Sequence, residues 1–93
     1  MKLNIIDSTI TRTYTIGGCD GFMIDIVDHG GEYEAFIYHE DYGIKSLMFG
    51  CSKTQKYGDV YMNMSLDEFK DLVISNLETE NYIQFYINDY MED

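Results

Sequence analysis

The sequence predicts a single α+β domain: an antiparallel β-meander of four to five strands, followed by one or two C-terminal helices packed on the sheet. Three observations lead to this class. The first two-thirds of the chain consists of short alternating segments separated by glycine turns. At Ser65 the pattern changes to that of an amphipathic helix. The 93 residues, 45% hydrophobic, suit one domain, 1–93, with 1–64 mainly β and 65–93 mainly helical.

The first clear strand spans Thr9 to Ile16. Threonines at every second position share one side, and Ile10, Arg12, Tyr14 and Ile16 share the other, as in a half-buried strand. The glycine-rich segment 17–21 ends it. Whether Lys2 to Asp7 adds a strand decides between four strands and five.

Phe22–Asp28 and Tyr33–His39 form the best-defined hairpin. Gly30-Gly31 between them can adopt positive φ at both positions, as a type I′ turn requires. This two-residue loop sets the register, so that Ile26 faces Ala35, Ile24 faces Ile37 and Phe22 faces His39. Apolar residues then meet on one side of the hairpin.

A turn over 40–43 and a strand over Ile44 to Gly50 follow. If four residues close this hairpin, Phe36 lies opposite Leu47 and Glu34 opposite Phe49. The second face of the sheet, with Met23, is then too apolar to stay in water, so we expect the tail or a second subunit to cover it. Cys51 to Asp59 suggests a loop, and Val60 to Met64 a short last strand.

The C-terminal third begins with a helix. Ser65 and Glu68 have the spacing of a capping box, and the apolar stripe contains Leu66, Phe69, Val73 and Leu77 with Leu72. The tail from Glu80 to Asp93 fits either a helix or a strand by its periodicity. A helix is favoured, because a strand would leave its tyrosine face uncovered.

The chain is strongly acidic, with a formal net charge of −11. The charge falls in two blocks of −7, residues 20–41 and 65–93, separated by segments of net charge +1 and +2. This balance disfavours direct binding to nucleic acid. No apolar run is long enough for a membrane span, and no signal peptide is evident. We therefore expect a cytoplasmic protein with Cys19 and Cys51 reduced.

No pattern in the sequence predicts a cofactor, a metal site or a catalytic centre. Histidines 29 and 39 stand at opposite ends of one hairpin, and Asp20, Asp25 and Asp28 lack the spacing of a calcium loop. A catalytic thiol would need His39 beside a cysteine, and a small buried thiol is the preferred interpretation. We therefore expect a protein that is not an enzyme.

The acidic blocks are the distinctive feature. Carboxylates on a rigid surface can occupy lysine and arginine sites that otherwise hold phosphates, and tyrosines among them supply contact area. An ordinary solvated acidic surface is the alternative. The residues expected to bind a partner are Asp67, Asp71, Glu78, Glu80, Tyr82, Tyr86, Asp89, Glu34, Glu40 and Asp41.

In length, charge and mixing of tyrosine with acids, the chain resembles the small acidic inhibitors of phages and mobile elements, including anti-CRISPR proteins and other nucleic-acid mimics. The resemblance is carried by Asp20–Asp41 and Ser65–Asp93. It implies a non-enzymatic inhibitor that binds the basic groove of a nucleic-acid-processing effector, such as a CRISPR nuclease complex, in the host cytoplasm if phage-encoded. The alternative is a small cytosolic structural or adaptor domain whose acidity serves solubility. A homodimer is one form that such a domain could take.

Overall fold

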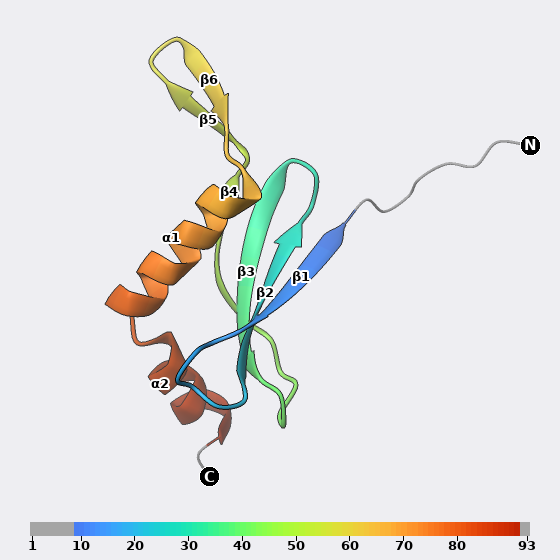
Figure 1. Ribbon diagram of the computed structural model, residues 1–93, viewed down its shortest axis with the longest axis vertical. Helices are drawn as coiled ribbons and strands as arrows, with labels where there is room; N and C mark the ends of the chain where they lie inside the picture. The colour runs from blue at the N-terminus through green and yellow to red at the C-terminus, as the bar shows by residue number, and fades with distance from the viewer. Residues whose placement is uncertain (1–8, 92–93) are drawn as a thin grey trace, which may run out of the picture.

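A computed structural model describes residues 9–91. It contains a four-stranded antiparallel sheet in the order β1-β2-β3-β4, with all helices after the strands in the chain (Figure 1). The sequence-based prediction of an α+β meander followed by C-terminal helices is confirmed. The segment Lys2 to Asp7, for which the sequence leaves an additional strand open, lies outside the described residues. The sheet strands are β1 Ile10–Thr15, β2 Phe22–Asp28, β3 Glu32–His39 and β4 Ser46–Ser52. The helical elements are α1 Leu66–Thr79, α2 Tyr82–Tyr86 and the π-helical turn η1 Ile87–Met91.

A second, two-stranded sheet projects beyond the start of α1 (Figure 1). It pairs β5 Thr54–Tyr57 with β6 Val60–Asn63. The predicted strand at Val60 is confirmed, whereas the predicted loop over Cys51 to Asp59 is wrong. Most positions of this hairpin are exposed, and the two strands are held together by backbone pairing. The sequence therefore lacks the alternation of apolar and polar residues that would predict strand β5.

The β2–β3 register is the predicted one, with Ile24 opposite Ile37 and Ile26 opposite Ala35. His29 N–H donates to the Glu32 carbonyl at 2.9 Å, closing the two-residue turn. Only Gly30 of the two turn glycines has positive φ, at 93°. That pattern belongs to a type II′ turn and not to the type I′ turn that the sequence suggested.

A β-bulge in β4 changes the β3–β4 register. Phe36 lies opposite Leu47 as expected, but Phe49 lies opposite Ala35, because Met48 is an extra residue on β4. The predicted pairing of Glu34 with Phe49 is therefore wrong. Phe49 turns instead to the helical side of the sheet, where its ring centroid lies 5.3 Å from that of Phe69.

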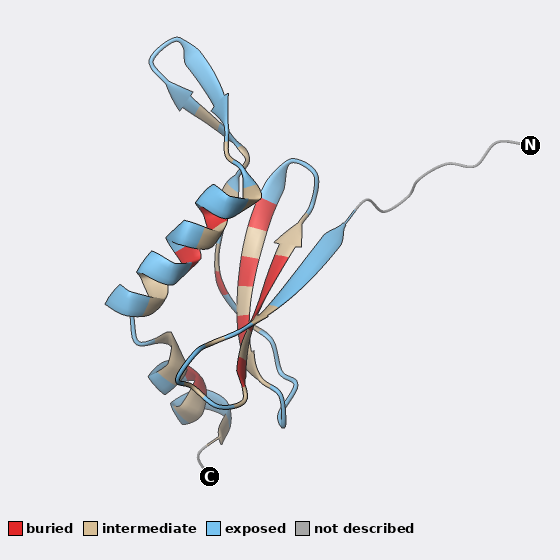
Figure 2. Cartoon of the chain, in the orientation of Figure 1, coloured by how far each residue is buried: buried red, intermediate tan, exposed pale blue. Residues whose placement is uncertain are grey.

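The core lies between the sheet and the helices (Figure 2). Phe69 and Val73 of α1 are buried, and Tyr33 stacks on Phe69 at 5.0 Å. The predicted capping box is present: Ser65 Oγ accepts from Glu68 N–H at 3.2 Å, and Glu68 Oε1 accepts from Ser65 N–H at 3.1 Å. The buried apolar residues are Phe22, Ile24, Ile26, Tyr33, Ala35, Ile37, Met48, Phe69, Val73 and Tyr86.

The tail is helical, as favoured from the sequence, and it packs on the same face as α1 (Figure 1). It therefore does not cover the opposite face of the sheet, which we call the outer face and define by Met23, Asp25, Val27, Glu34, Phe36, Tyr38 and Leu47. No helix or second sheet within residues 9–91 lies over this face, and Leu47 there is 54% exposed.

Candidate functional site: an acidic helix beside an apolar groove

Three of the predicted carboxylates form a row along α1. Asp67, Asp71 and Glu78 are all exposed, and at 100° per residue they lie within about 40° of one another around the helix. No lysine, arginine or histidine of the described residues forms an ion pair with them. We call these three residues the acidic row.

The position of Glu78 is electrostatically unfavourable for α1 itself. The helix ends at Thr79, its last turn has no basic residue, and Glu80 follows as the C-cap. Carboxylates near a helix C-terminus oppose the helix dipole, whereas Asp67 in the first turn is favoured by it. Helix stability therefore explains Asp67 but not Glu78 or Glu80.

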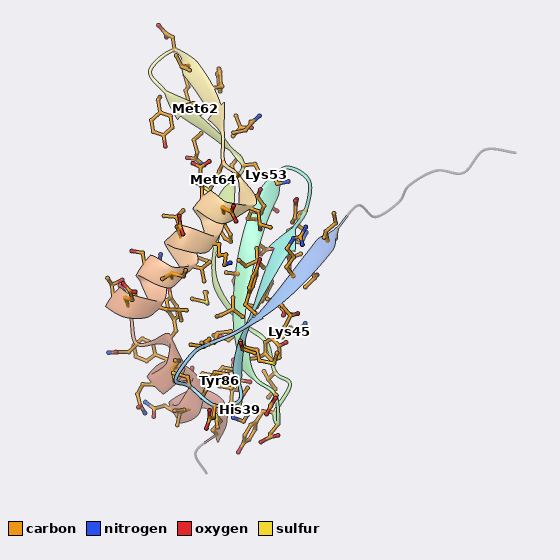
Figure 3. All side chains as sticks on the ribbon, viewed as in Figure 1. His39, Lys45, Lys53, Met62, Met64 and Tyr86 are labelled. Atoms are coloured by element: carbon orange, nitrogen blue, oxygen red, sulfur yellow. The ribbon has the colours of Figure 1, made fainter. Side chains whose placement is uncertain are left out.

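The acids of the β2–β3 hairpin do not form a second free ridge. Asp25 Oδ2 lies 2.6 Å from Lys45 Nζ, and Asp28 Oδ1 lies 2.5 Å from Lys53 Nζ. The two lysines flank β4 at its opposite ends (Figure 3). Glu34 Oε1 lies 2.5 Å from His29 Nε2. The expectation that this block carries free negative charge is wrong for Asp25 and Asp28, because lysines distant in the chain pair with them.

Asp25 is the most enclosed carboxylate of the described residues, at 2% exposure on the outer face. Its Oδ1 accepts hydrogen bonds from Thr13 Oγ1 at 2.8 Å and Tyr38 Oη at 3.2 Å. Burial raises the Asp25 pKa, but the contacts with Lys45, Thr13 and Tyr38 outweigh it and hold the pKa below its ordinary value. Burial and the nearby carboxylate raise the pKa of Tyr38. This cluster is a satisfied structural network.

The remaining predicted partner-binding residues are scattered. Glu40 and Asp41 are exposed in the turn between β3 and β4, and Asp41 Oδ2 lies 3.9 Å from His39 Nδ1. Glu34 belongs to the outer face, opposite to the face that α1 covers. The two acidic blocks therefore do not share one face.

The C-terminal candidates divide between surface and core. Glu80 and Asp89 are exposed, and Tyr82 is half-buried against the core. Tyr86 is only 2% exposed, so its predicted role as a contact residue is wrong. Its ring faces the core, in edge contact with Phe22 at 5.9 Å.

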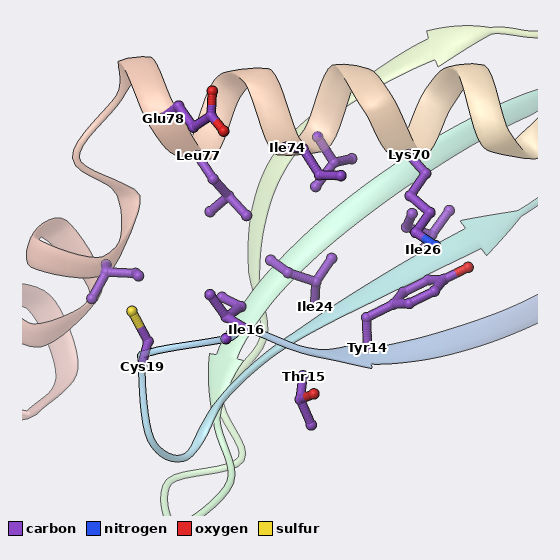
Figure 4. Close-up of a pocket in the computed structure, with 13 residues that line it drawn as sticks. Tyr14, Thr15, Ile16, Cys19, Ile24, Ile26, Lys70, Ile74, Leu77 and Glu78 are labelled. Atoms are coloured by element: carbon purple, nitrogen blue, oxygen red, sulfur yellow. The ribbon is translucent and has the colours of Figure 1, made fainter.

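A groove that the sequence did not reveal lies between α1 and the β1–β2 edge of the sheet (Figure 4). It has a volume of about 570 Å³. Ile24 and Ile26 of β2 line it, with Tyr14 and Ile16 on the β1 side and Ile74 and Leu77 on the α1 side. Lys70 and Glu78 are its charged lining residues, and Lys70 Nζ lies 4.8 Å from the centre of the Tyr14 ring.

The described residues show no arrangement for metal chemistry. Within residues 9–91, no three His, Cys, Asp or Glu side chains are grouped to hold a metal ion. Cys51 lies opposite Tyr33, at the other end of β3 from His39, and burial raises the pKa of its thiol. In this part of the chain His39 forms no hydrogen bond with Cys19; its Nδ1 accepts from Asp41 N–H at 3.2 Å.

The fold and these surfaces define a small α+β domain that presents an acidic helix beside an apolar groove. No described helix combines the length and the hydropathy needed to cross a bilayer. Comparisons with family models, curated proteins and solved structures found no match to this chain.

Proposed function

We propose that this chain is a non-enzymatic acidic inhibitor that acts in the cytoplasm and binds the basic nucleic-acid-binding groove of a nucleic-acid-processing effector. A CRISPR nuclease complex is one effector of this class, and the resemblance in composition to phage inhibitors motivates that choice. The observation that carries the proposal is the acidic row: three carboxylates on one side of a capped helix, without cationic partners in residues 9–91.

The spacing of the row suits a phosphate-binding surface. Asp67 and Asp71 are separated by about 6 Å along the helix axis, and Asp71 and Glu78 by about 10.5 Å, at 1.5 Å per residue. These separations approximate two and three steps of 3.4 Å along one DNA strand. Lysines and arginines arranged for phosphates along a groove can therefore meet the three carboxylates in turn.

The paired charges support a one-sided mode of binding. Lys45 and Lys53 are engaged with Asp25 and Asp28, and Lys45 belongs with the outer face, away from α1. Exposed charges are screened over about 8 Å at physiological salt. The paired lysines Lys45 and Lys53 therefore contribute little repulsion toward a cationic partner that binds at the acidic row. The row thus presents its negative charge to a cationic partner.

Capture from host lysate followed by competition tests the proposal. At about 50 mM salt the protein should retain a nucleic-acid-binding partner, and at about 200 mM salt it should release most of it. Fluorescence anisotropy of labelled nucleic acid on the purified partner should then fall as this protein is added, with the nucleic acid recovered intact. If the partner binds this protein and its nucleic acid simultaneously, the proposal is wrong.

The outer face supports a second candidate, a homodimeric adaptor domain. Leu47 is 54% exposed there, beside the partly buried Phe36. The carboxylates Asp25 and Glu34 of this face are paired with Lys45 and His29. Two strongly acidic chains that meet through this face would therefore not bring an unpaired Asp25 to the contact.

Sedimentation equilibrium distinguishes the two candidates. The adaptor predicts a dimer that Leu47→Asp dissociates, while Val60→Asp, at a 59% exposed strand position in the β5–β6 hairpin, leaves it intact. A wild-type protein that stays monomeric up to millimolar concentration excludes this candidate.

A further inference from the structure

The apolar groove has the dimensions of a peptide-binding site. Its α1 wall runs from Lys70 to Glu78, about 12 Å at 1.5 Å per residue, which is slightly more than two helical turns. Its volume of about 570 Å³ lies within the range of sites that bind ligands. Ile74 on this wall is 45% exposed, so the lining is accessible from outside.

The acidic row borders this groove. Ile74 lies within about 60° of each carboxylate of the row around the helix, and Glu78 belongs to both the row and the groove lining. Lys70, the cationic lining residue, is placed over the Tyr14 ring. The site therefore combines an apolar floor that contains one cation, Lys70, with the anionic edge that the row adds along α1, the arrangement of an interface with an anchor pocket and a charged edge.

This charge pattern selects the occupant. A fatty acid, a nucleotide or an anionic lipid would find one lining cation, Lys70, but its negative charge would be repelled by the three carboxylates of the row. A basic protein segment would be attracted, and apolar side chains on one side of it would enter the groove. Since the α1 wall spans about two turns, the segment that fits along it is a helix with apolar residues at i, i+3 or i+4, and i+7.

We propose that the groove between α1 and β1 binds an amphipathic basic helix of the partner protein, with its apolar side chains against Ile16, Ile74 and Leu77 and its lysines or arginines on the acidic row. This inference rests on the proposed function and specifies which element of the basic partner is bound.

Two synthetic peptides of about four turns, about 14 residues, provide the first test. One carries leucine at i, i+3, i+4 and i+7 with lysine elsewhere, and the other has serine in place of leucine at the same net charge. Titration calorimetry should show the leucine peptide binding at least about tenfold more tightly, with helical circular dichroism in the complex. Equal affinities, or an extended bound peptide, would overturn the inference.

Two aspartate substitutions on α1 provide the matched control. Ile74→Asp places a charge in the groove, whereas Leu72→Asp, at a position 39% exposed and outside the groove lining, adds the same charge elsewhere. Since added negative charge attracts a lysine peptide, loss of binding in a folded Ile74→Asp variant reflects lost apolar contact. We expect at least about tenfold weaker binding for Ile74→Asp and unchanged or slightly tighter binding for Leu72→Asp.

The outcomes separate this inference from the proposed function. If Ile74→Asp and Leu72→Asp bind the leucine peptide equally well, the groove is not the site, although capture of a nucleic-acid-binding partner by the acidic row still stands. If circular dichroism shows that Ile74→Asp is unfolded, Ile74→Ala replaces it and must still weaken the leucine peptide more than the serine peptide. Equal weakening of both peptides by Ile74→Ala would overturn the inference.

Discussion

Tyr86 donates its phenolic hydroxyl to the carbonyl of Ile44 at 2.5 Å, across 42 positions of the chain. Tyr86 lies in α2, and Ile44 lies in the connection between β3 and β4. Tyr86 and His39 both lie at this end of the sheet (Figure 3), and each ring makes an edge contact with Phe22. The bond ties the C-terminal helix to the β3–β4 connection and so holds the tail on the same face as α1.

Removing that hydroxyl should destabilise the fold without removing the ring. Tyr86→Phe leaves the Ile44 carbonyl without this donor and should lower the free energy of unfolding by about 1 kcal/mol. Urea unfolding followed by circular dichroism measures the change. Tyr82→Phe removes a hydroxyl that makes no hydrogen bond within residues 9–91, and it should leave the midpoint nearly unchanged; equal effects would mean that the Tyr86 bond contributes nothing.

Removing the lysine that pairs with Asp25 should lower the free energy of unfolding by more than Tyr86→Phe does. Lys45→Met leaves the buried carboxylate with only Thr13 and Tyr38 as partners, and we expect a loss of about 1–3 kcal/mol in the free energy of unfolding at pH 7. Lys56→Met is the control, because Lys56 forms no ion pair within the described residues and should change stability by less than about 0.5 kcal/mol.

The hydrogen bonds and the ion pair of Asp25 should also make the stability of the fold depend on pH. The pKa of Asp25 is lower in the folded protein than its ordinary value, so the unfolded chain binds the proton more readily. The stabilisation is therefore present above about pH 4 and is lost as the pH falls through the lower folded pKa. Acid titration of wild type and Lys45→Met should show the variant unfolding at higher pH; identical acid midpoints would contradict this.

Gly21 and Gly18 offer a matched pair with the same backbone conformation. Both have φ of 82°, but a Cβ on Gly21 would overlap the His39 ring, whereas one on Gly18 would meet no atom within 4 Å. Gly18→Ala should cost about 1–2 kcal/mol from the left-handed backbone alone, and Gly21→Ala about 1–3 kcal/mol more. Thermal unfolding compares them, and equal midpoints would exclude a steric role for His39.

The fold was predictable where local signals were strong. Gly30-Gly31 sets the β2–β3 register through its two-residue length, and Ser65 with Glu68 marks the helix start. The bulge at Met48 was not predictable. One extra residue in β4 moves Phe49 to the other face of the sheet, and the sequence pattern of the strand before Met48 gives no sign of it. The strand β5 was missed because its exposed polar residues carry no burial pattern.

The candidate site was predictable in part. The positions of Asp67, Asp71 and Glu78 in the helix place them on one side by periodicity alone. The four-residue spacing of Tyr82, Tyr86 and Tyr90 does not predict which of the three tyrosines is buried. In the structure Tyr86 is the one that is buried in the core. The ion pairs of Asp25 and Asp28 join residues 20 and 25 positions apart, and the groove joins β1 to α1. Such long-range contacts are set by the tertiary fold.

The most direct test of the account compares two triple variants of equal net charge. One, Asp67→Asn, Asp71→Asn and Glu78→Gln, neutralises the acidic row; the other, Asp20→Asn, Glu32→Gln and Asp59→Asn, neutralises exposed carboxylates elsewhere. Both are titrated against the captured nucleic-acid-binding partner at about 50 mM salt. We expect the row variant to lose at least about tenfold in affinity and the second variant to stay close to wild type. Equal affinities for the two variants would mean that only total charge matters, and they would contradict the claim that α1 carries the binding surface.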